Sequence, residues 1–377
     1  MNVNPTLKKE GIRVIGQLNT REIHKIASNI SKKMAETFSD HNINEQDLFA
    51  SLSTLNMFIA EMPEQTSVAK YYYKNNAIYF SSSMDLSDLN IPAVHECLHF
   101  IQEQKNSRGK LLRFGLYDLR GPFHHGMAIN EASVQHMASI AMGSELDTVK
   151  YYNMELSTES PDFYPIITAL LNEMTYFTGT YALYHSTLYS DDIFKNTFIA
   201  KSSSKVYSQI ETNFDLILSY ESLLSQEVEK LSLFSNDVEN INKIKKTNAK
   251  IEGYKKIIQQ KTLETQNLII NNCFDSSFNS IKNMEDISNF ELSLQTFRNV
   301  MINTKDYTFF DSYCKQIVPK LDEKREFILK YGNILTLDSI TKELSRVEEQ
   351  TYGFRFFKKL FHKLKLLIED ALREKEL

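Results

Sequence analysis

Glycine and proline, the residues that interrupt helices most strongly, are unevenly distributed along this chain of 377 residues. Six of the seven prolines lie at or before Pro165, and only Pro319 follows. Of the 11 glycines, four come after the same point. The first half is therefore expected to fold as short elements and the second as long helices. This pattern predicts a mainly α (α+β) protein with two domains, residues 1–200 and 201–377.

The chain is expected to be helical beyond about Ser202. Isoleucines recur there at spacings that approximate a three-four repeat, among lysine, asparagine and glutamate, at Ile241, Ile244, Ile251 and Ile258. An apolar stripe of this period is typical of one face of a helix that packs against a neighbour. We expect residues 201–377 to contain an antiparallel helical hairpin or a short coiled coil.

Shorter elements are predicted in the first half from capping residues, apolar periodicity and β-prone runs. Asn19 lies three residues before Glu22, as in a capping box at the start of a helix. The expected elements are a helix over 19–37, a helix over 44–60, strands over 71–73 and 77–80 joined as a hairpin, a helix from 88 or 90 to 104, a loop-rich stretch over 106–126, and a helix over 128–142.

Composition and charge exclude several classes of protein. A net charge of -5 and a pI near 6.0 argue against nucleic-acid binding. The three cysteines lie far apart, which excludes a disulfide framework and a cysteine-based zinc site. Residues 1–16 contain no apolar export segment, and no run is long enough to span a membrane. We therefore expect a cytoplasmic protein, with leaderless export left open.

The most informative motif is H-E-x-x-H, formed by His95, Glu96 and His99. On a helix, positions i and i+4 lie on one face, so both imidazoles can reach a single ion. Glu96 is rotated about 100° away and can contact a water on that ion without binding it. Cys97 points to another face and is expected in the core. The alternative is a hydrogen-bonded histidine pair without metal.

A catalytic metal site needs a third protein ligand, and Glu131 is the best candidate. It lies in the first turns of an otherwise apolar helix, where a lone carboxylate is costly unless it is paired. Its alternative role is that of an acidic residue favoured by the dipole of the helix N-terminus. His124 and His125 are rival ligands, of which at most one would bind because adjacent side chains diverge.

The hairpin, the His95-Glu96-x-x-His99 helix and the later Asn130-Glu131-Ala132 run resemble the zincin metallopeptidases, of the gluzincin, thermolysin-like type. The resemblance covers about residues 65–180 and includes small bacterial zincins. It implies a zincin-like domain in which Zn²⁺ is held by His95, His99 and Glu131, with Glu96 as general base. Two departures are a long linker between His99 and Glu131, and Gln135 where an aspartate often orients a zinc-bound histidine. The zincin type with a third histidine is excluded, because Gln102 and Lys105 occupy the relevant positions.

The predicted function is hydrolysis of a peptide or protein substrate, and a non-catalytic helical scaffold with a degenerate zincin-like half is the alternative. Candidate stabilisers of the oxyanion are Tyr176, Tyr181, Tyr184 and His185, although core packing is the more common role for each of them. The strand over 77–80 is a candidate for pairing with an extended peptide. Residues 354–367 read as a basic amphipathic helix, which can contact a membrane but more commonly packs on the protein's own core.

Overall fold

The protein is seen here in a computed structural model that describes residues 7, 9–63, 68–121, 125–234, 240–304 and 309–331. It is mainly helical, with 64% helix and 13% strand, and the strands form small sheets. The expectation of a mainly helical α+β protein is therefore confirmed, while a zincin-like fold stays a proposal.

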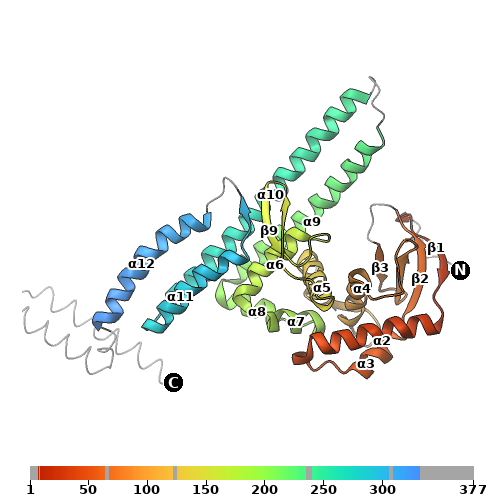
Figure 1. The fold of residues 1–377 in the computed structure, drawn as a ribbon, viewed down its shortest axis with the longest axis horizontal. Helices are drawn as coiled ribbons and strands as arrows, with labels where there is room; N and C mark the ends of the chain where they lie inside the picture. The colour runs from red at the N-terminus through yellow and green to blue at the C-terminus, as the bar shows by residue number, and fades with distance from the viewer. Residues whose placement is uncertain are drawn as a thin grey trace, which may run out of the picture. The chain divides into compact units, whose positions relative to one another are not determined.

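The helices and strands follow one another along the chain as labelled in Figure 1. The helices are α2 (Thr20–Thr37), η1 (Ser39–His41), α3 (Glu45–Leu52), α4 (Ile91–Ile101), α5 (Met127–Ala141), α6 (Pro165–Thr178), α7 (Thr180–Tyr189), α8 (Ile193–Lys201), α9 (Ser204–Ser232), α10 (Ile241–Asn279), α11 (Met284–Thr296), η3 (Phe297–Asn299) and α12 (Phe309–Tyr331). The strands are β1 (Arg13–Gln17), β2 (Asn56–Glu61), β3 (Ala69–Tyr72), β4 (Ala77–Ser81), β5 (Glu103–Lys105), β6 (Leu111–Phe114), β7 (Tyr117–Asp118), β8 (Asp147–Tyr151), β9 (Met154–Thr158) and β10 (Asn303–Thr304).

The chain divides into two compact units. Among the described residues, one unit holds everything up to Asn279 together with 293–313, and the other holds 280–292 and 314–331. These units differ from the predicted domains 1–200 and 201–377, because α9 and α10 belong to the unit that contains the first 200 residues. His95, His99 and Glu131 all belong to the first unit.

The largest sheet has the strand order β1-β2-β4-β3. Strands β3 and β4 are antiparallel, which confirms the predicted hairpin, and β4 also pairs in parallel with β2. Successive side chains of a strand point to opposite faces, so Ile78 and Phe80 enter one core cluster while Ala77 and Tyr79 enter another. The strand over 77–80 is thus interior, and its predicted pairing with a substrate peptide is wrong. The edge of this sheet is formed by β3 instead.

Helices α2, α4 and α5 share one apolar core with the sheet. The start of α2 is fixed by the predicted capping box: the Asn19 side chain accepts from the Glu22 amide at 3.1 Å, and the Glu22 carboxylate accepts from the Asn19 amide at 2.7 Å. Helix α5 belongs to two cores. Val134, Met137 and Ala138 pack in the sheet-side core, whereas the first turns of α5 pack in a second core formed with α6, α8, α9 and α10.

Helices α9 and α10 form an antiparallel hairpin. Glu227 pairs with Lys250 at 3.1 Å, and the rings of Tyr220 and Tyr254 lie 5.7 Å apart. Position numbers fall along α9 as they rise along α10, as an antiparallel pair requires. The predicted helical hairpin is therefore present, and a coiled coil in the strict sense stays a prediction.

Several predicted elements have different bounds. The helix expected over 44–60 ends at Leu52, and the apolar run that follows becomes β2 because it pairs with both β1 and β4. The stretch expected as loop over 106–126 contains β6 and β7, and the hairpin of β8 and β9 was not predicted. In each case, pairing with a distant or adjacent strand decides the structure, and local sequence signals do not reveal that pairing.

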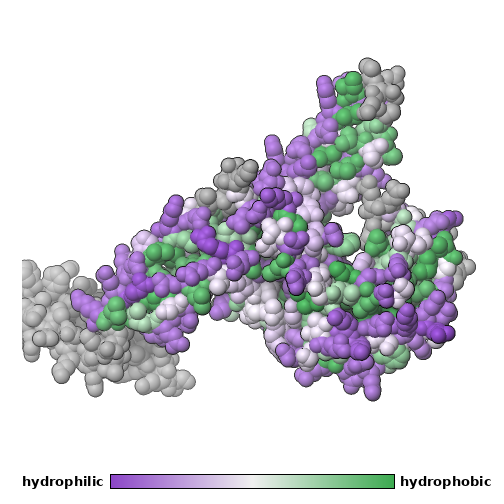
Figure 2. Space-filling view, in the orientation of Figure 1, coloured by the Kyte–Doolittle hydropathy of each residue, from purple (hydrophilic) through white to green (hydrophobic). Residues whose placement is uncertain are grey.

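The surface is mixed in character (Figure 2). Hydrophilic residues cover the outer side of α2 and α3, and hydrophobic residues gather near the far end of the α9–α10 hairpin, where Leu233 is 78% exposed. None of the helices described is long and apolar enough to cross a membrane. The basic helix predicted over 354–367 lies outside the described residues.

Candidate metal centre

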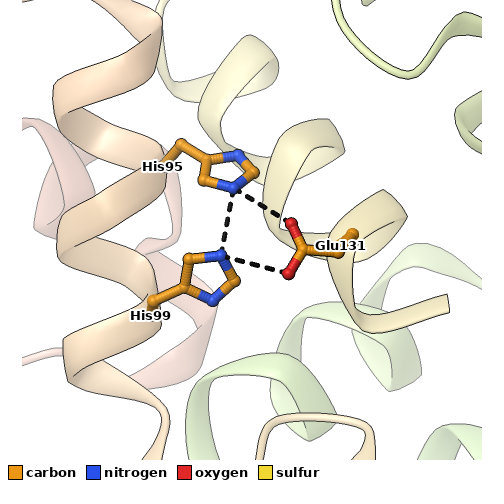
Figure 3. A group of neighbouring side chains, drawn as sticks. All are labelled: His95, His99 and Glu131. Carbon is orange, nitrogen blue, oxygen red and sulfur yellow. Dashed lines mark hydrogen bonds and ion pairs between the residues drawn. The ribbon is translucent and has the colours of Figure 1, made fainter. Parts of the chain in front are cut away.

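Helix α4 carries both histidines of the H-E-x-x-H motif. Asn90 begins the helix by accepting a hydrogen bond from the Ala93 amide at 3.0 Å, and Pro92 occupies the first turn, where its missing N–H costs nothing. This start places His95 and His99 one turn apart on the same face, towards α5 (Figure 3). Cys97 lies on another face and is fully buried in the core, as predicted.

Glu131, from α5, completes a group of three side chains (Figure 3). Its carboxylate oxygens lie 3.4 Å from His95 Nε2 and 3.5 Å from His99 Nε2, and the two Nε2 atoms lie 3.0 Å apart. Three donors bound at about 2.0–2.1 Å to one tetrahedral ion are separated by roughly 3.3 Å. The donor set and its spacing therefore fit a small divalent cation. The structure brings together all three predicted ligands.

Gln135 fixes the orientation of His95. Its Oε1 lies 2.9 Å from His95 Nδ1, while its Nε2 donates to Ser160 at 2.9 Å and to Ser139 at 3.3 Å. Because the amide nitrogen is already donating, its oxygen faces the ring and accepts the Nδ1 proton. The Nε2 lone pair of His95 is then left pointing at the centre of the group, which is the arrangement that a metal ligand needs.

Electrostatics hold Glu131 in its charged form. Burial alone would raise the pKa of Glu131, but His99 and His95 hold it well below its usual range. Burial likewise opposes a charge on His99, yet the Glu131 carboxylate raises the pKa of that imidazole above its ordinary value. The Glu131 carboxylate is therefore anionic and is stabilised by a nearby positive charge. That charge can be a proton on one of the histidines or a cation bound between the three side chains.

Glu96 is buried beside this group and is held by strand β3. Its Oε2 accepts a hydrogen bond from the backbone N–H of Tyr71 at 2.5 Å. That N–H points away from β4, because Tyr71 lies on the open edge of the sheet. The predicted general base is thus fixed between helix α4 and an edge strand, and it is separate from the three candidate ligands.

The position of Glu131 depends on how α5 begins. Gly126, with φ of +91°, precedes the helix, and Asp215 of α9 accepts from the Gly126 amide at 3.1 Å and the Ala128 amide at 2.9 Å. The rival ligand His125 is about half exposed, and its nearest acidic partner is Asp215 at 3.9 Å. His124 lies outside the described residues.

The four predicted oxyanion stabilisers do not meet at this site. Their contacts among the described residues lie elsewhere: Tyr176 donates to Ser293, Tyr181 stacks on His41, Tyr184 bonds His136, and His185 pairs with Asp191. Tyr184 packs against both apolar cores, in agreement with the alternative role in the core, whereas Tyr181 is 55% exposed, so that alternative is wrong for Tyr181.

Tyr164 is a site residue that sequence reasoning missed. Its ring lies 6.3 Å from the His95 ring at an interplanar angle of 29°, and no hydrogen bond from its hydroxyl occurs among the described residues. Burial, then the carboxylates of Glu131 and Glu96, raise its pKa. Its φ of +55° is unusual for an aromatic residue. A Tyr-Pro pair at the start of α6 was visible in the sequence, but its place against α4 was not.

Comparisons of this chain with protein-family models, with curated proteins and with solved structures gave no match.

Proposed function

We propose that this protein is a zinc-dependent peptidase that hydrolyses peptide bonds in a peptide or protein substrate. The observation that carries the proposal is the convergence of His95, His99 and Glu131 beside a separately held glutamate. Two imidazoles and one carboxylate form a donor set that suits Zn²⁺ and leaves a coordination position open. When bound, such an ion supplies Lewis acidity, which makes water more acidic and stabilises developing negative charge.

Glu96 is suited to the role of general base. It is buried, it is not one of the three converging donors, and the Tyr71 amide holds its carboxylate in place. In the proposed reaction Glu96 takes a proton from the attacking water and delivers it to the departing amine. One oxygen of the Glu96 carboxylate accepts the Tyr71 hydrogen bond, so the other oxygen remains available for this proton transfer.

Tyr164 is suited to stabilise the oxyanion that forms when water attacks the carbonyl. Since burial and nearby carboxylates raise the pKa of Tyr164, its hydroxyl keeps its proton and can donate it in a hydrogen bond. The Tyr164 ring lies 6.3 Å from the ring of His95, and this proximity supports a role for Tyr164 beside the candidate metal centre. The left-handed backbone of Tyr164 costs roughly 1–2 kcal/mol, and such strain is often kept at functional sites.

The proposal is tested by cleavage of a mixture of unfolded proteins by the zinc-loaded chain, with mass spectrometry of the products. Glu96→Gln should bind zinc as before and lose activity by a factor of about 10²–10⁴. Glu145→Gln, which removes an exposed carboxylate away from the site, is the matched control and should cleave normally. Zinc binding without any cleavage would instead favour the non-catalytic scaffold.

A further inference from the structure

The turn between strands β6 and β7 lies against both helices that carry the candidate ligands. Gln102 follows α4, three residues after His99, and Asn130 immediately precedes Glu131 on α5. A Cβ added at Gly115 would lie 2.6 Å from the side-chain oxygen of Gln102 and 2.4 Å from that of Asn130. The backbone of Gly115 therefore approaches the end of α4 and the first turn of α5 at the same time.

Hydrogen bonds hold this turn in place. The Gly115 amide donates to the hydroxyl of Ser190 at 2.8 Å, and that hydroxyl donates in turn to the carbonyl of Gln102. The Leu116 amide donates to the side-chain oxygen of Asn130 at 3.0 Å. Successive residues of the turn are thus bonded towards α4 and α5, and a shift of the turn would break a contact with one of the two helices.

Phe114, the last residue of β6, contacts one of the candidate ligands directly. Its ring lies 6.0 Å from the ring of His99 at an interplanar angle of 89°, which is an edge-to-face arrangement. His95 is oriented by the hydrogen bond between its Nδ1 and Gln135. Among the described residues, the hydrogen bonds and ion pairs of the His99 ring involve only its Nε2. The contact with Phe114 therefore restricts a ring that lacks the hydrogen bond that orients His95.

We propose that residues 114–116 position the candidate metal ligands. Gly115 sets the separation between α4 and α5, and Phe114 sets the orientation of the His99 ring. Glycine is required at position 115 because its φ is +49° and because a Cβ would have no room there. Both residues act through the ligands, so they are positioning residues. The inference rests on the proposed function in one respect, that the three side chains bind a divalent cation.

The experiment measures metal binding by the full chain, with Co²⁺ as a spectroscopic probe and with Zn²⁺ in competition with a chromophoric chelator. Gly115→Ala inserts a Cβ against α4 and α5 and should lower zinc affinity by about tenfold or more. It should also change the visible spectrum of bound Co²⁺, because that spectrum reports the geometry of the ligands. Phe114→Leu keeps an apolar side chain without the ring, and it should change the spectrum and lower zinc affinity by about 2–10-fold.

Gly109→Ala is the matched control. Gly109 lies in the neighbouring β5–β6 turn and also has a positive φ, of +73°. Apart from its chain neighbours, no described residue has an atom within 4 Å of a Cβ added there. Gly109→Ala should therefore lose stability through backbone strain and still bind both metals as the unmodified chain does.

Unchanged zinc affinity with an unchanged Co²⁺ spectrum, in a folded Gly115→Ala chain or in Phe114→Leu, would overturn the inference. So would a loss of affinity in Gly109→Ala as large as that in Gly115→Ala, because strain alone would then be the cause. Circular dichroism shows whether each variant folds, and if Gly115→Ala does not, Phe114→Leu decides through the same two measurements. No metal binding by the unmodified chain would also overturn the inference. Failure of the proposed function is read separately, as lack of cleavage by an unmodified chain that binds zinc.

Discussion

Gln135 holds the Nδ1 side of His95 with a neutral amide rather than a carboxylate. It links the candidate ligand to Ser160, which in turn donates to the carbonyl of Phe163, immediately before Tyr164. One side chain thus orients a ligand and supports the segment that carries the proposed oxyanion donor. A ligand held in this way loses less freedom when a metal binds.

Replacing Gln135 by leucine is expected to lower zinc affinity by about 10–100-fold, because His95 loses the acceptor that fixes its tautomer. Competition with a chromophoric chelator measures the change. Gln135→Glu keeps an acceptor at the same place and should retain most of the affinity, and equal affinity of the leucine variant would show that the hydrogen bond is not needed.

Glu159 stabilises the fold in its charged form. Burial alone would raise the pKa of Glu159, but hydrogen bonds from His136 and Asn172 hold it below its ordinary value of about 4.5. The stabilisation is therefore present above pH 4.5 and is lost as the pH falls through the depressed pKa. Glu159→Gln should cost about 2 kcal/mol at pH 7 and progressively less below pH 4. Urea denaturation across this range measures the difference, and a constant difference would contradict the charged state.

Glu173 is expected to give the stability of the fold a pH dependence opposite to that of Glu159. It is fully buried, accepts from Gln266 and from the Ile302 amide, and has one oxygen without a partner among the described residues. Burial raises its pKa to about 8, so the folded protein holds a proton that the unfolded chain has lost. Stability should fall as the pH rises from about 4.5 to 8.

Glutamine at position 173 does not ionise, so the Glu173→Gln variant should not lose stability as the pH rises. It should be more stable than the unmodified protein by about 2 kcal/mol at pH 8 and should differ little from it at pH 4. Thermal unfolding at both pH values measures these differences. The Glu159→Gln variant is compared in parallel, because its stability difference is expected to depend on pH in the opposite direction. Greater stability of the unmodified protein at pH 8 would mean that the buried carboxylate is charged and compensated.

Residues of the candidate metal centre differ in how far the sequence determines their positions. His95 and His99 are four apart on one helix, so local spacing suffices to place them together. Glu131 could be predicted as a ligand because an unpaired carboxylate in an apolar helix is energetically costly. Tyr164 precedes α6, and only tertiary packing brings its ring near His95, so no local signal could reveal it.

Among the secondary-structure elements, α5 depends most on a distant part of the chain. Its N-terminus is capped by Asp215 of α9 rather than by a neighbouring residue. Gly126 also lets Glu211 of α9 approach closely, since an added Cβ would meet the Glu211 carboxylate at 3.1 Å. The helical hairpin is thereby joined to the helix that carries Glu131. This connection explains why a division at residue 200 does not match the compact units.

Removing the cap tests that connection. Asp215→Ala should destabilise the protein by about 1 kcal/mol and weaken zinc binding, because the first turns of α5 that position Glu131 lose their acceptor. Asp215→Asn keeps an acceptor oxygen and serves as the control. Chemical denaturation and zinc competition are measured together. A loss of stability with unchanged zinc affinity would show that α5 holds Glu131 without the cap.

Elements predicted from capping and periodicity, such as α2 and the β3–β4 hairpin, have their signals within a few residues. Strand β2 does not. Residues 56–61 have an apolar pattern that continues a helix, but β1 and β4 pair with them on both sides. Strand pairing across the chain overrides local propensity there, and a single sequence contains no direct sign of it.

At the scale of the whole first unit, the candidate metal centre lies where two apolar cores meet. His95 and His99 come from α4, which packs in the core on the sheet, while Glu131 lies on the turns of α5 that enter the core of α6, α9 and α10. A bound cation would therefore join α4 to α5 at the boundary between the two cores. Its effect should extend beyond the site to the unfolding of the unit.

We expect one equivalent of zinc to stabilise the folded unit by an amount that follows its concentration, about 2.7 kcal/mol at 100 times the dissociation constant. Calorimetric unfolding with and without zinc, after removal of metal by a chelator, measures this shift. Glu131→Gln should unfold at nearly the same temperature in both conditions, because the amide lacks the charge that attracts the ion. If that variant gained as much stability from zinc as the unmodified chain, the ion would be binding elsewhere, and Glu131 would be an ordinary partner of the two histidines.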